Sequence, residues 1–101
     1  MTQSPEDINS INKLIHEPAR MSIMAVLSAV DQADFKYLMT STNLTKGNLS
    51  LHLSKLEDAS YIEIIKSFIG KTPNTNVRLT RLGRTEFNNY IRQMRKLMKN
   101  L

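Results

Sequence analysis

Residues 44–62 read LTKGNLSLHLSKLEDASYI, and the rest of the chain is organised around this stretch. Thr45 is a favourable N-cap, because its hydroxyl can accept a backbone N–H group two or three residues on, and no proline follows up to Ala59. At about 100° per residue, three leucines fall on one narrow stripe, namely Leu49, Leu53 and Leu56. The sequence therefore predicts a helix over about 45–59 that packs this stripe against the body of the domain.

The opposite face of this helix is free of acids over its first two turns. Its side chains are small, hydrogen-bonding or cationic, apart from one leucine, and they are Gly47, Asn48, Ser50, Leu51, Ser54 and Lys55. An ordinary surface helix would more often carry Glu and Lys pairs there, whereas here the acids come only at Glu57 and Asp58. A helix that enters the major groove of DNA between phosphates needs such a face. The stretch is therefore interpreted as a DNA recognition helix.

Composition and charge agree with this interpretation. The chain has 101 residues, 41% hydrophobic and 23% charged, which is typical of one globular domain over 1–101. The formal net charge of +5 is uneven, because residues 1–44 carry three cations against five acids while residues 45–101 carry eleven cations against four acids. A polyanion would therefore meet the second half of the chain. Charge alone would be equally compatible with a solvated cationic face.

Several function classes are excluded or disfavoured. The chain has no cysteine, so disulfides, thiolate catalysis and cysteine-ligated zinc are excluded. The only histidines, His16 and His52, are far apart, and His52 fits a packing position at the helix edge better than a ligand. The GKT triplet at 70–72 lacks the glycine that a phosphate-binding loop requires. No enzyme activity, cofactor or metal is expected. The polar N-terminus and the lack of a long apolar run predict a cytoplasmic protein.

The first 44 residues predict three helices. A short amphipathic helix begins near Ser4 and ends near His16, and Pro18 then opens a second helix that is apolar on more than one side and so lies in the middle of the domain. Asp34 can cap a third, short helix, and Asn43 can adopt the left-handed conformation of a tight turn after it. A short helix, a tight turn and a capped helix are the parts of a helix-turn-helix.

After the recognition helix the pattern becomes that of strands. Residues 61–69 are rich in β-branched and aromatic side chains, residues 75–80 alternate apolar and polar, and GKTPN at 70–74 is a loop. The sequence predicts a β-hairpin over about 61–79. Its polar and basic side chains could lie along a phosphate backbone or reach a minor groove, and they are Lys66, Lys71, Thr72, Asn74, Thr75 and Arg78. A plain solvated loop is the competing interpretation, and the position after a helix-turn-helix favours the first.

Thr80 can cap a last helix over about 81–101, roughly 30 Å long. Its apolar side chains recur at three and four residues and approach a heptad seam, formed by Phe87, Tyr90, Ile91, Met94, Leu97, Met98 and Leu101. The seam is longer than a small core needs, so it predicts a homodimer interface that the N-terminal helix joins through Ile8, Ile11 and Ile15. Binding of a basic amphipathic helix to an anionic membrane is disfavoured, because the seam is narrow and lacks tryptophan.

This order of elements resembles the winged helix-turn-helix transcriptional regulators of the MarR and ArsR type, especially the small one-domain archaeal and bacterial ones. The resemblance covers nearly the whole chain. It rests on HEPARMSIMAVL at 16–27, LTKGNLSLHLSKLEDASYIEI at 44–64 and FIGKTPNTNVRLTRLGRTEF at 68–87. It implies a mainly α fold with a β-hairpin wing, and a homodimer that binds double-stranded DNA at a near-palindromic operator, usually as a repressor.

By position, the resemblance implies a set of DNA-facing residues. They are Thr45, Lys46, Gly47, Asn48, Ser50, Leu51 and Lys55 on the helix, with Lys71 and its neighbours on the wing. Two departures stand out: Ser60 occupies a place where the family usually has glycine, which implies a turn that is either strained or rearranged, and the cysteine ligands of metal-sensing ArsR members are absent. Whether a small-molecule effector binds stays open. The alternative function is a winged-helix module for protein–protein assembly, whose basic surface meets an acidic partner.

Overall fold

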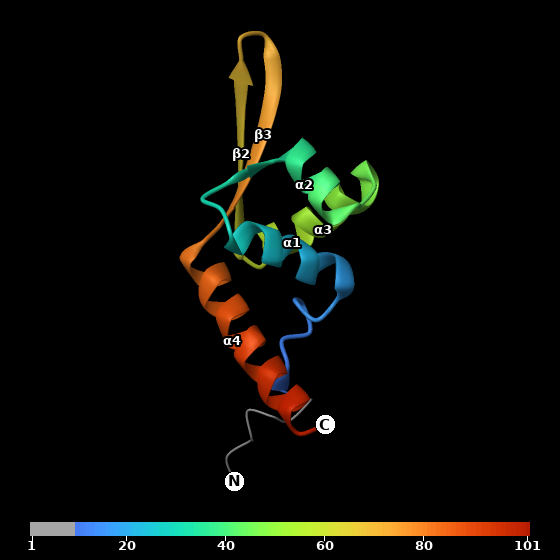
Figure 1. Cartoon of the computed structure of the whole chain (residues 1–101). Coiled ribbons are helices and arrows are strands. Elements are labelled where there is room, and N and C mark those ends of the chain that lie inside the picture. Colours follow the sequence, from blue (N-terminus) through green and yellow to red (C-terminus); the bar gives the residue numbers. More distant parts are fainter. Residues whose placement is uncertain (1–9) are drawn as a thin grey trace.

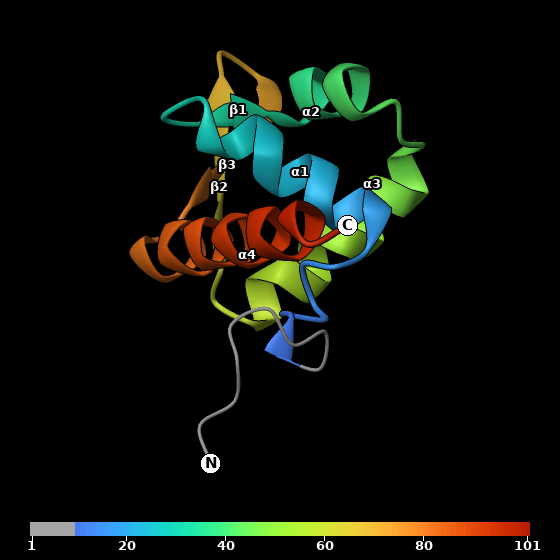
Figure 2. The same ribbon diagram turned by 60° about the horizontal axis from the view of Figure 1, so that its bottom comes forward.

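The computed structural model describes residues 10–101, which fold into four helices and a three-stranded antiparallel sheet (Figure 1). The helices are α1 (Pro18–Ser28), α2 (Phe35–Thr42), α3 (Lys46–Asp58) and α4 (Arg81–Lys99). The strands are β1 (Ala33–Asp34), β2 (Ile62–Ile69) and β3 (Thr72–Leu79), in the order β1-β3-β2. In Figures 1 and 2, α1 lies between α2 and α4, and the β2–β3 hairpin projects beyond the helices. This arrangement confirms the predicted class, mainly α with a wing.

Local side-chain caps set the starts of three helices. Asp34, Thr45 and Thr80 each accept the backbone N–H of the third residue on, at the beginning of α2, α3 and α4. Between α2 and α3, Asn43 has φ of 57°, the left-handed conformation that the turn requires. These predicted caps and the predicted turn residue are confirmed.

The predicted N-terminal helix is wrong over residues 11–16, and its beginning lies outside the described residues. Residues 11–17 form no helix and contain turns and bends. The Asn12 side chain accepts the N–H groups of Leu14 and Ile15 at 3.0 and 3.2 Å, which satisfies the backbone locally and competes with helical bonds. His16 Nδ1 lies 2.8 Å from the Tyr90 hydroxyl, and burial raises the pKa of that phenol. The segment therefore lies against α4 as an irregular strap.

The core sits where the helices meet the base of the sheet. Leu49, Leu53 and Leu56 of α3 are 0%, 3% and 0% exposed, which confirms the predicted packing stripe. Two-residue β1 pairs Ala33 with Val77 of β3 and was not predicted, because so short a strand leaves no periodic signal. None of the helices in residues 10–101 is long and apolar enough to cross a membrane.

Strand register fixes which wing side chains face α3. Directly paired residues of β2 and β3 share a face, and the pairs run from Ile62 with Leu79 to Ile69 with Thr72. Buried Val77 pairs with Ile64, so this face belongs to the core at the hairpin's base. Every second pair farther out continues the same face toward the tip. Gly70, with φ of 64°, makes the tip turn.

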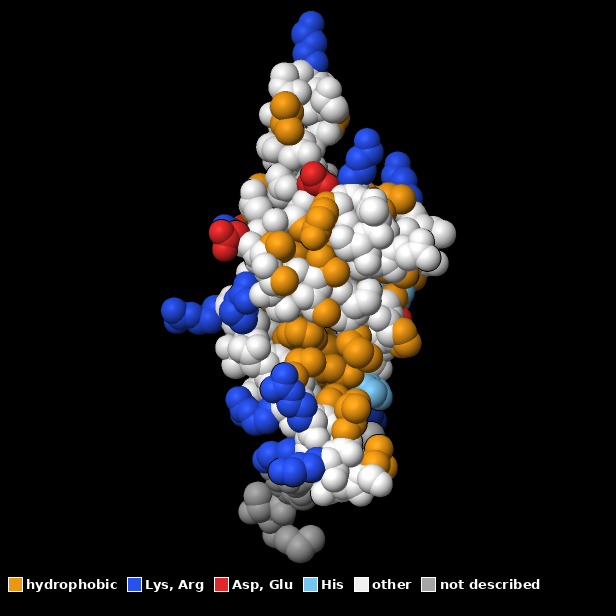
Figure 3. Space-filling model, viewed as in Figure 1, with side chains coloured by type: hydrophobic (Ala, Val, Ile, Leu, Met, Phe, Trp, Pro, Cys, Tyr) orange, Lys and Arg blue, Asp and Glu red, His pale blue; other side chains and the backbone are white. Residues whose placement is uncertain are grey.

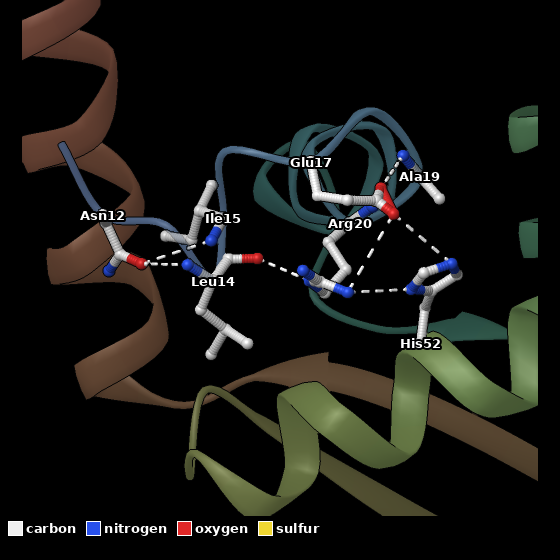
Figure 4. A network of polar contacts seen from close by, with 7 residues as sticks. All are labelled: Asn12, Leu14, Ile15, Glu17, Ala19, Arg20 and His52. Atoms are coloured by element: carbon white, nitrogen blue, oxygen red, sulfur yellow. Dashed lines mark hydrogen bonds and ion pairs between the residues drawn. The ribbon is translucent and has the colours of Figure 1, made fainter. Parts of the chain in front are cut away.

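A polar network fastens α3 to the start of α1 (Figure 4). Glu17 caps α1 by accepting the N–H groups of Ala19 and Arg20, and its carboxylate lies 3.5 Å from Nε2 of His52 on α3. Arg20 donates to Leu14 O and contacts His52 Nδ1 at 3.1 Å. Because a guanidinium only donates, Nδ1 accepts, and the proton of the neutral imidazole lies on Nε2, toward Glu17.

The same contacts set the charge of Glu17. Desolvation by partial burial acts to raise the pKa of the Glu17 carboxyl. The backbone N–H groups of Arg20 and Ala19, together with electrostatic attraction from His52 and Arg20, outweigh it and hold the pKa below its ordinary value. Stability from this carboxylate is therefore fully present above the pKa of an unfolded glutamate, and it is lost as the pH falls through the lower pKa of the folded state.

The close joint between the wing and α4 depends on backbone contact. A Cβ atom on Gly83 would lie 1.9 Å from the Tyr61 carbonyl oxygen, so only glycine lets α4 start there. The Tyr61 carbonyl also accepts the N–H of Thr80 at 3.0 Å, and the Thr80 hydroxyl donates to the Ser60 carbonyl at 2.6 Å. Ser60 itself has φ of 64°, so the strain expected at this turn is present in the backbone.

Replacing Ser60→Gly should stabilise the fold, because glycine adopts a positive φ without the steric cost of a Cβ atom. We expect the free energy of unfolding to rise by up to about 1 kcal/mol, measured by urea denaturation. Asn43→Gly is the matched control, since asparagine tolerates its φ of 57° and the gain there should be smaller. An unchanged or lower stability of Ser60→Gly would contradict the inferred strain.

Replacing Glu17→Gln should lower the free energy of unfolding near neutral pH by roughly half a kcal/mol, because the cap loses its negative charge at a helix N-terminus. Urea denaturation at a series of pH values measures this difference. It should vanish at a pH well below the ordinary pKa of glutamate, where the wild-type carboxyl is protonated as well. A difference that stayed constant with pH would show that the charge of Glu17 contributes nothing.

Candidate nucleic-acid interface

The face of α3 opposite the leucine stripe is exposed along its whole length. All eight residues predicted to face DNA on this helix and its cap are exposed, and they are Thr45, Lys46, Gly47, Asn48, Ser50, Leu51, Ser54 and Lys55. Leu51 is 53% exposed, so an apolar side chain is available on this face. Because the stripe on the other side is buried, the rotation of α3 about its axis is fixed, and this face points away from the domain.

A groove of about 600 Å³ lies between α3 and the wing. Three lysines line it from three elements: Lys36 from α2, Lys46 from α3 and Lys66 from β2. Polar residues border it as well, namely Ser50, Ser54, Thr72, Asn74 and Thr75, and of these the strand register turns the side chains of Thr72 and Asn74 to the other face of the hairpin. This combination of cations and hydrogen-bond donors is the chemistry that proteins use to hold a phosphate backbone.

Two acids also border this groove, Asp34 and Glu57. Asp34 is committed to its capping role, because its Oδ1 accepts the Tyr37 N–H at 2.7 Å. Glu57 comes from the C-terminal half of α3, away from the acid-free turns that the sequence singled out. The negative charge therefore comes from the last turns of α3 and from a helix cap.

The predicted wing residues separate into groups. Lys66, Thr72, Asn74 and Thr75 line the groove, and Lys71 lies in the turn at the tip. Arg78 does not join them. Its pairing with Glu63 puts both side chains on the face away from α3, and its guanidinium forms an ion pair with the Glu63 carboxylate at 3.0 Å. Strand alternation turns the side chains of Thr72 and Asn74 to the same far face, although both residues border the groove. Arg78 differs from these two because it lies nearer the base of the hairpin and has an acidic partner.

Sequence reasoning missed two exposed residues at the start of α2, Lys36 and Tyr37. Lys36 lines the groove, and Tyr37 is 52% exposed. The sequence could have indicated both residues, because Asp34 predicted the start of this helix and the first helix of a helix-turn-helix crosses the DNA backbone. Figure 3 shows Lys and Arg side chains projecting from the hairpin tip and from the nearby end of the helical part.

The residues of the predicted dimer seam differ in how deeply they are buried. Ile11, Ile15, Phe87 and Tyr90 belong to the chain's own core, at 6% exposure or less, so they are not available on the surface. Farther along α4, Ile91, Met94 and Leu97 are partly buried and Met98 is exposed, as is Leu101 just beyond the end of the helix. Ile8 lies outside the described residues. Figure 3 shows a band of apolar side chains down the helical part, beside the cations of the lower end.

The described part of the chain contains no cluster of metal-ligating side chains. Among residues 10–101, no group of three or more His, Cys, Asp or Glu side chains lies close enough together to hold a metal ion. The polar chemistry gathered beside α3 is that of lysines, hydroxyls and amides.

Comparisons with known proteins agree with this geometry. A family model described as a winged helix DNA-binding domain matches residues 19–98. An uncharacterized protein of Methanocaldococcus jannaschii is 38% identical over 89 residues, which are 88% of this chain and 97% of that protein. A transcriptional regulator homologue from Pyrococcus horikoshii superposes with a TM-score of 0.82 at 26% identity, covering 88% of each chain.

A MarR family regulator from Silicibacter pomeroyi has a TM-score of 0.69 at 23% identity, with 87% of this chain and 58% of that chain covered, and it shows the shared fold. These likenesses confirm the resemblance inferred from the sequence. The chain belongs to the winged helix DNA-binding domain family, with the fold of transcriptional regulators of the MarR and ArsR type.

Proposed function

We propose that this chain is a sequence-specific transcriptional regulator that binds a near-palindromic DNA operator as a homodimer and represses by occupying it. The groove between α3 and the wing is the observation that carries this proposal. Its lysines come from three elements that only the fold brings together, and they lie beside the acid-free face of α3. A phosphate strand running through this groove would place α3 in the major groove of the duplex.

Within this arrangement, the exposed residues of α3 take two roles. Lys46 and Lys55 bind phosphates, which gives affinity without sequence preference. Asn48 faces the base edges, where an asparagine amide can pair with adenine through two hydrogen bonds, and Leu51 can contact the methyl group of thymine. The helix is positioned firmly for this, because three leucines and the His52 contacts fix its inner side.

The outer apolar residues at the end of α4 support a homodimer, and a two-fold symmetric dimer matches a near-palindromic operator. At 1.5 Å per residue, the 19-residue α4 is roughly 28 Å long, and its apolar residues continue past the core to Met98, which is 64% exposed. Fully exposed Leu101 follows just after the end of the helix. A second copy would bury this outer seam and place the two α3 helices on one side of a duplex, in successive major grooves.

The two roles on α3 predict different consequences of substitution. Lys46→Ala should weaken binding to all duplexes alike and reduce the slope of log affinity against log salt by about one, because one phosphate contact is lost. Asn48→Ala should instead change base preference, with a discrimination loss of about 1 to 3 kcal/mol at one position. The measurement is fluorescence anisotropy on operators recovered by selection from a random duplex pool.

The side chains of Lys46 and Asn48 are exposed, so neither substitution should change the thermal midpoint of unfolding. This midpoint serves as the control. If Asn48→Ala left the relative affinities of the operator variants unchanged, direct readout by Asn48 would be wrong. If the wild-type protein enriched no sequence and bound acidic proteins instead, the assembly-module alternative would replace the proposal.

If the dimer forms through this end of α4, Met98→Asp should give a monomer, because the interface would bury an unpaired carboxylate. Operator affinity should fall at least tenfold, because the contact with the second half-site is lost. Sedimentation velocity measures the mass. Arg92→Asp, from the cationic side of the same helix, is the matched control and should remain dimeric. An unchanged dimer in the Met98→Asp variant would refute an interface at this end of α4.

A further inference from the structure

The outer end of the wing carries two large apolar side chains with no place in the core. Phe68 is 70% exposed and Ile69 is 69% exposed. The hairpin packs against the core at the pair of Ile64 with Val77, which lies four residue pairs closer to the base than Phe68. A hairpin end in water is more often polar, since exposed apolar strand ends favour aggregation. These side chains therefore do not serve the stability of the isolated chain.

The two side chains point to opposite faces of the hairpin. Phe68 pairs with Pro73, and Lys66 pairs with Thr75 on the same face. Lys66, Thr75 and Pro73 all line the groove beside α3, so Phe68 extends that side of the wing to its end. Ile69 pairs with Thr72 one step farther out, and its side chain alternates to the reverse face.

The surroundings of Phe68 select a polyanion as its partner. No acid occurs between Ile64 and Leu79, while Lys66 and Lys71 flank the tip. Arg78, the other cation of the hairpin, is neutralised by Glu63 at the base. Phe68 therefore lies between two lysines that have no acidic partner among the described residues. This arrangement suits a partner whose phosphates line its outer edges and whose stacked bases lie between them. The minor groove of DNA has this construction, and phenylalanine and proline are among the residues that wedge into it.

We propose that Phe68, backed by Pro73, enters the minor groove beside each half-site and partly unstacks one base step, which bends the duplex. This inference rests on the proposed function, because α3 must first bind the adjacent major groove. Pyrimidine–purine steps unstack most easily, so the operator should prefer such a step opposite the wing tip although no hydrogen bond reads it.

The test uses the full chain and an operator duplex recovered by selection. The base analogue 2-aminopurine, placed at successive steps in the flanking minor groove, brightens when it is unstacked, and dyes on the duplex ends report bending by energy transfer. For the wild type we expect brightening at one step per half-site and a bend of at least about 20°. Phe68→Ala should lose both signals and bind roughly tenfold more weakly.

Ile69→Ala is the matched control, since Ile69 is equally exposed and lies next to Phe68 on the opposite face. It should retain the brightening, the bend and most of the affinity. Lys71→Ala should lower the salt dependence of binding while it leaves the bend unchanged. Each of these side chains is exposed, and an unchanged thermal midpoint verifies that each variant folds.

The outcomes separate this inference from the function on which it rests. A wild-type protein that binds the operator and leaves it straight and stacked overturns the wedge alone. Retained bending by Phe68→Ala, or an equal loss in Ile69→Ala, also overturns it. A wild-type protein that binds no duplex at all overturns the proposed function, and the wedge with it.

Discussion

Burial of the leucine stripe of α3 is the constraint on which the geometry of the interface depends. Leu49, Leu53 and Leu56 are almost completely buried, so the helix cannot rotate about its axis without exposing them to water. Burial on one side thereby determines what the other side presents. The exposed, acid-free face is a direct consequence of this packing, and the contacts of His52 with Arg20 and Glu17 hold the same inner side from the edge of the stripe.

The wing depends on a second constraint, located at its base. Ile64 and Val77 anchor the hairpin in the core, while the Ser60 turn and the contact of Gly83 with the Tyr61 backbone set its direction relative to α4. A strained φ persists at Ser60 because these contacts surround it. The same joint therefore links the direction of the wing, and with it the shape of the groove, to the start of the helix that carries the outer apolar seam.

The N-terminal strap shows how a periodic pattern can mislead. Ile11 and Ile15 recur at helical spacing and are buried as a helix would bury them, yet the backbone between them forms turns. Asn12 offers the backbone an alternative partner, and its amide also donates to the Tyr61 hydroxyl at 2.8 Å. Apolar spacing predicted which side chains are buried, and the local hydrogen bonds that Asn12 accepts from the Leu14 and Ile15 N–H groups decided the backbone conformation.

The sequence by itself determined the features that depend on near neighbours along the chain. The caps at Asp34, Thr45 and Thr80, the left-handed turn at Asn43 and the buried stripe of α3 all follow from residues within about four positions of one another. For the same reason, the exposed face of α3 could be predicted almost residue by residue.

Only the tertiary structure decided what lies across space. It brought Lys36 and Lys66 to the groove of Lys46, paired Arg78 with Glu63 on the far face, and placed Phe87 and Tyr90 in the core instead of on the seam. These outcomes depend on strand register and on the packing of α4, which join residues distant in sequence. The physical reason is that periodicity specifies which side of an element is apolar, while the contacts that cover that side come from other elements.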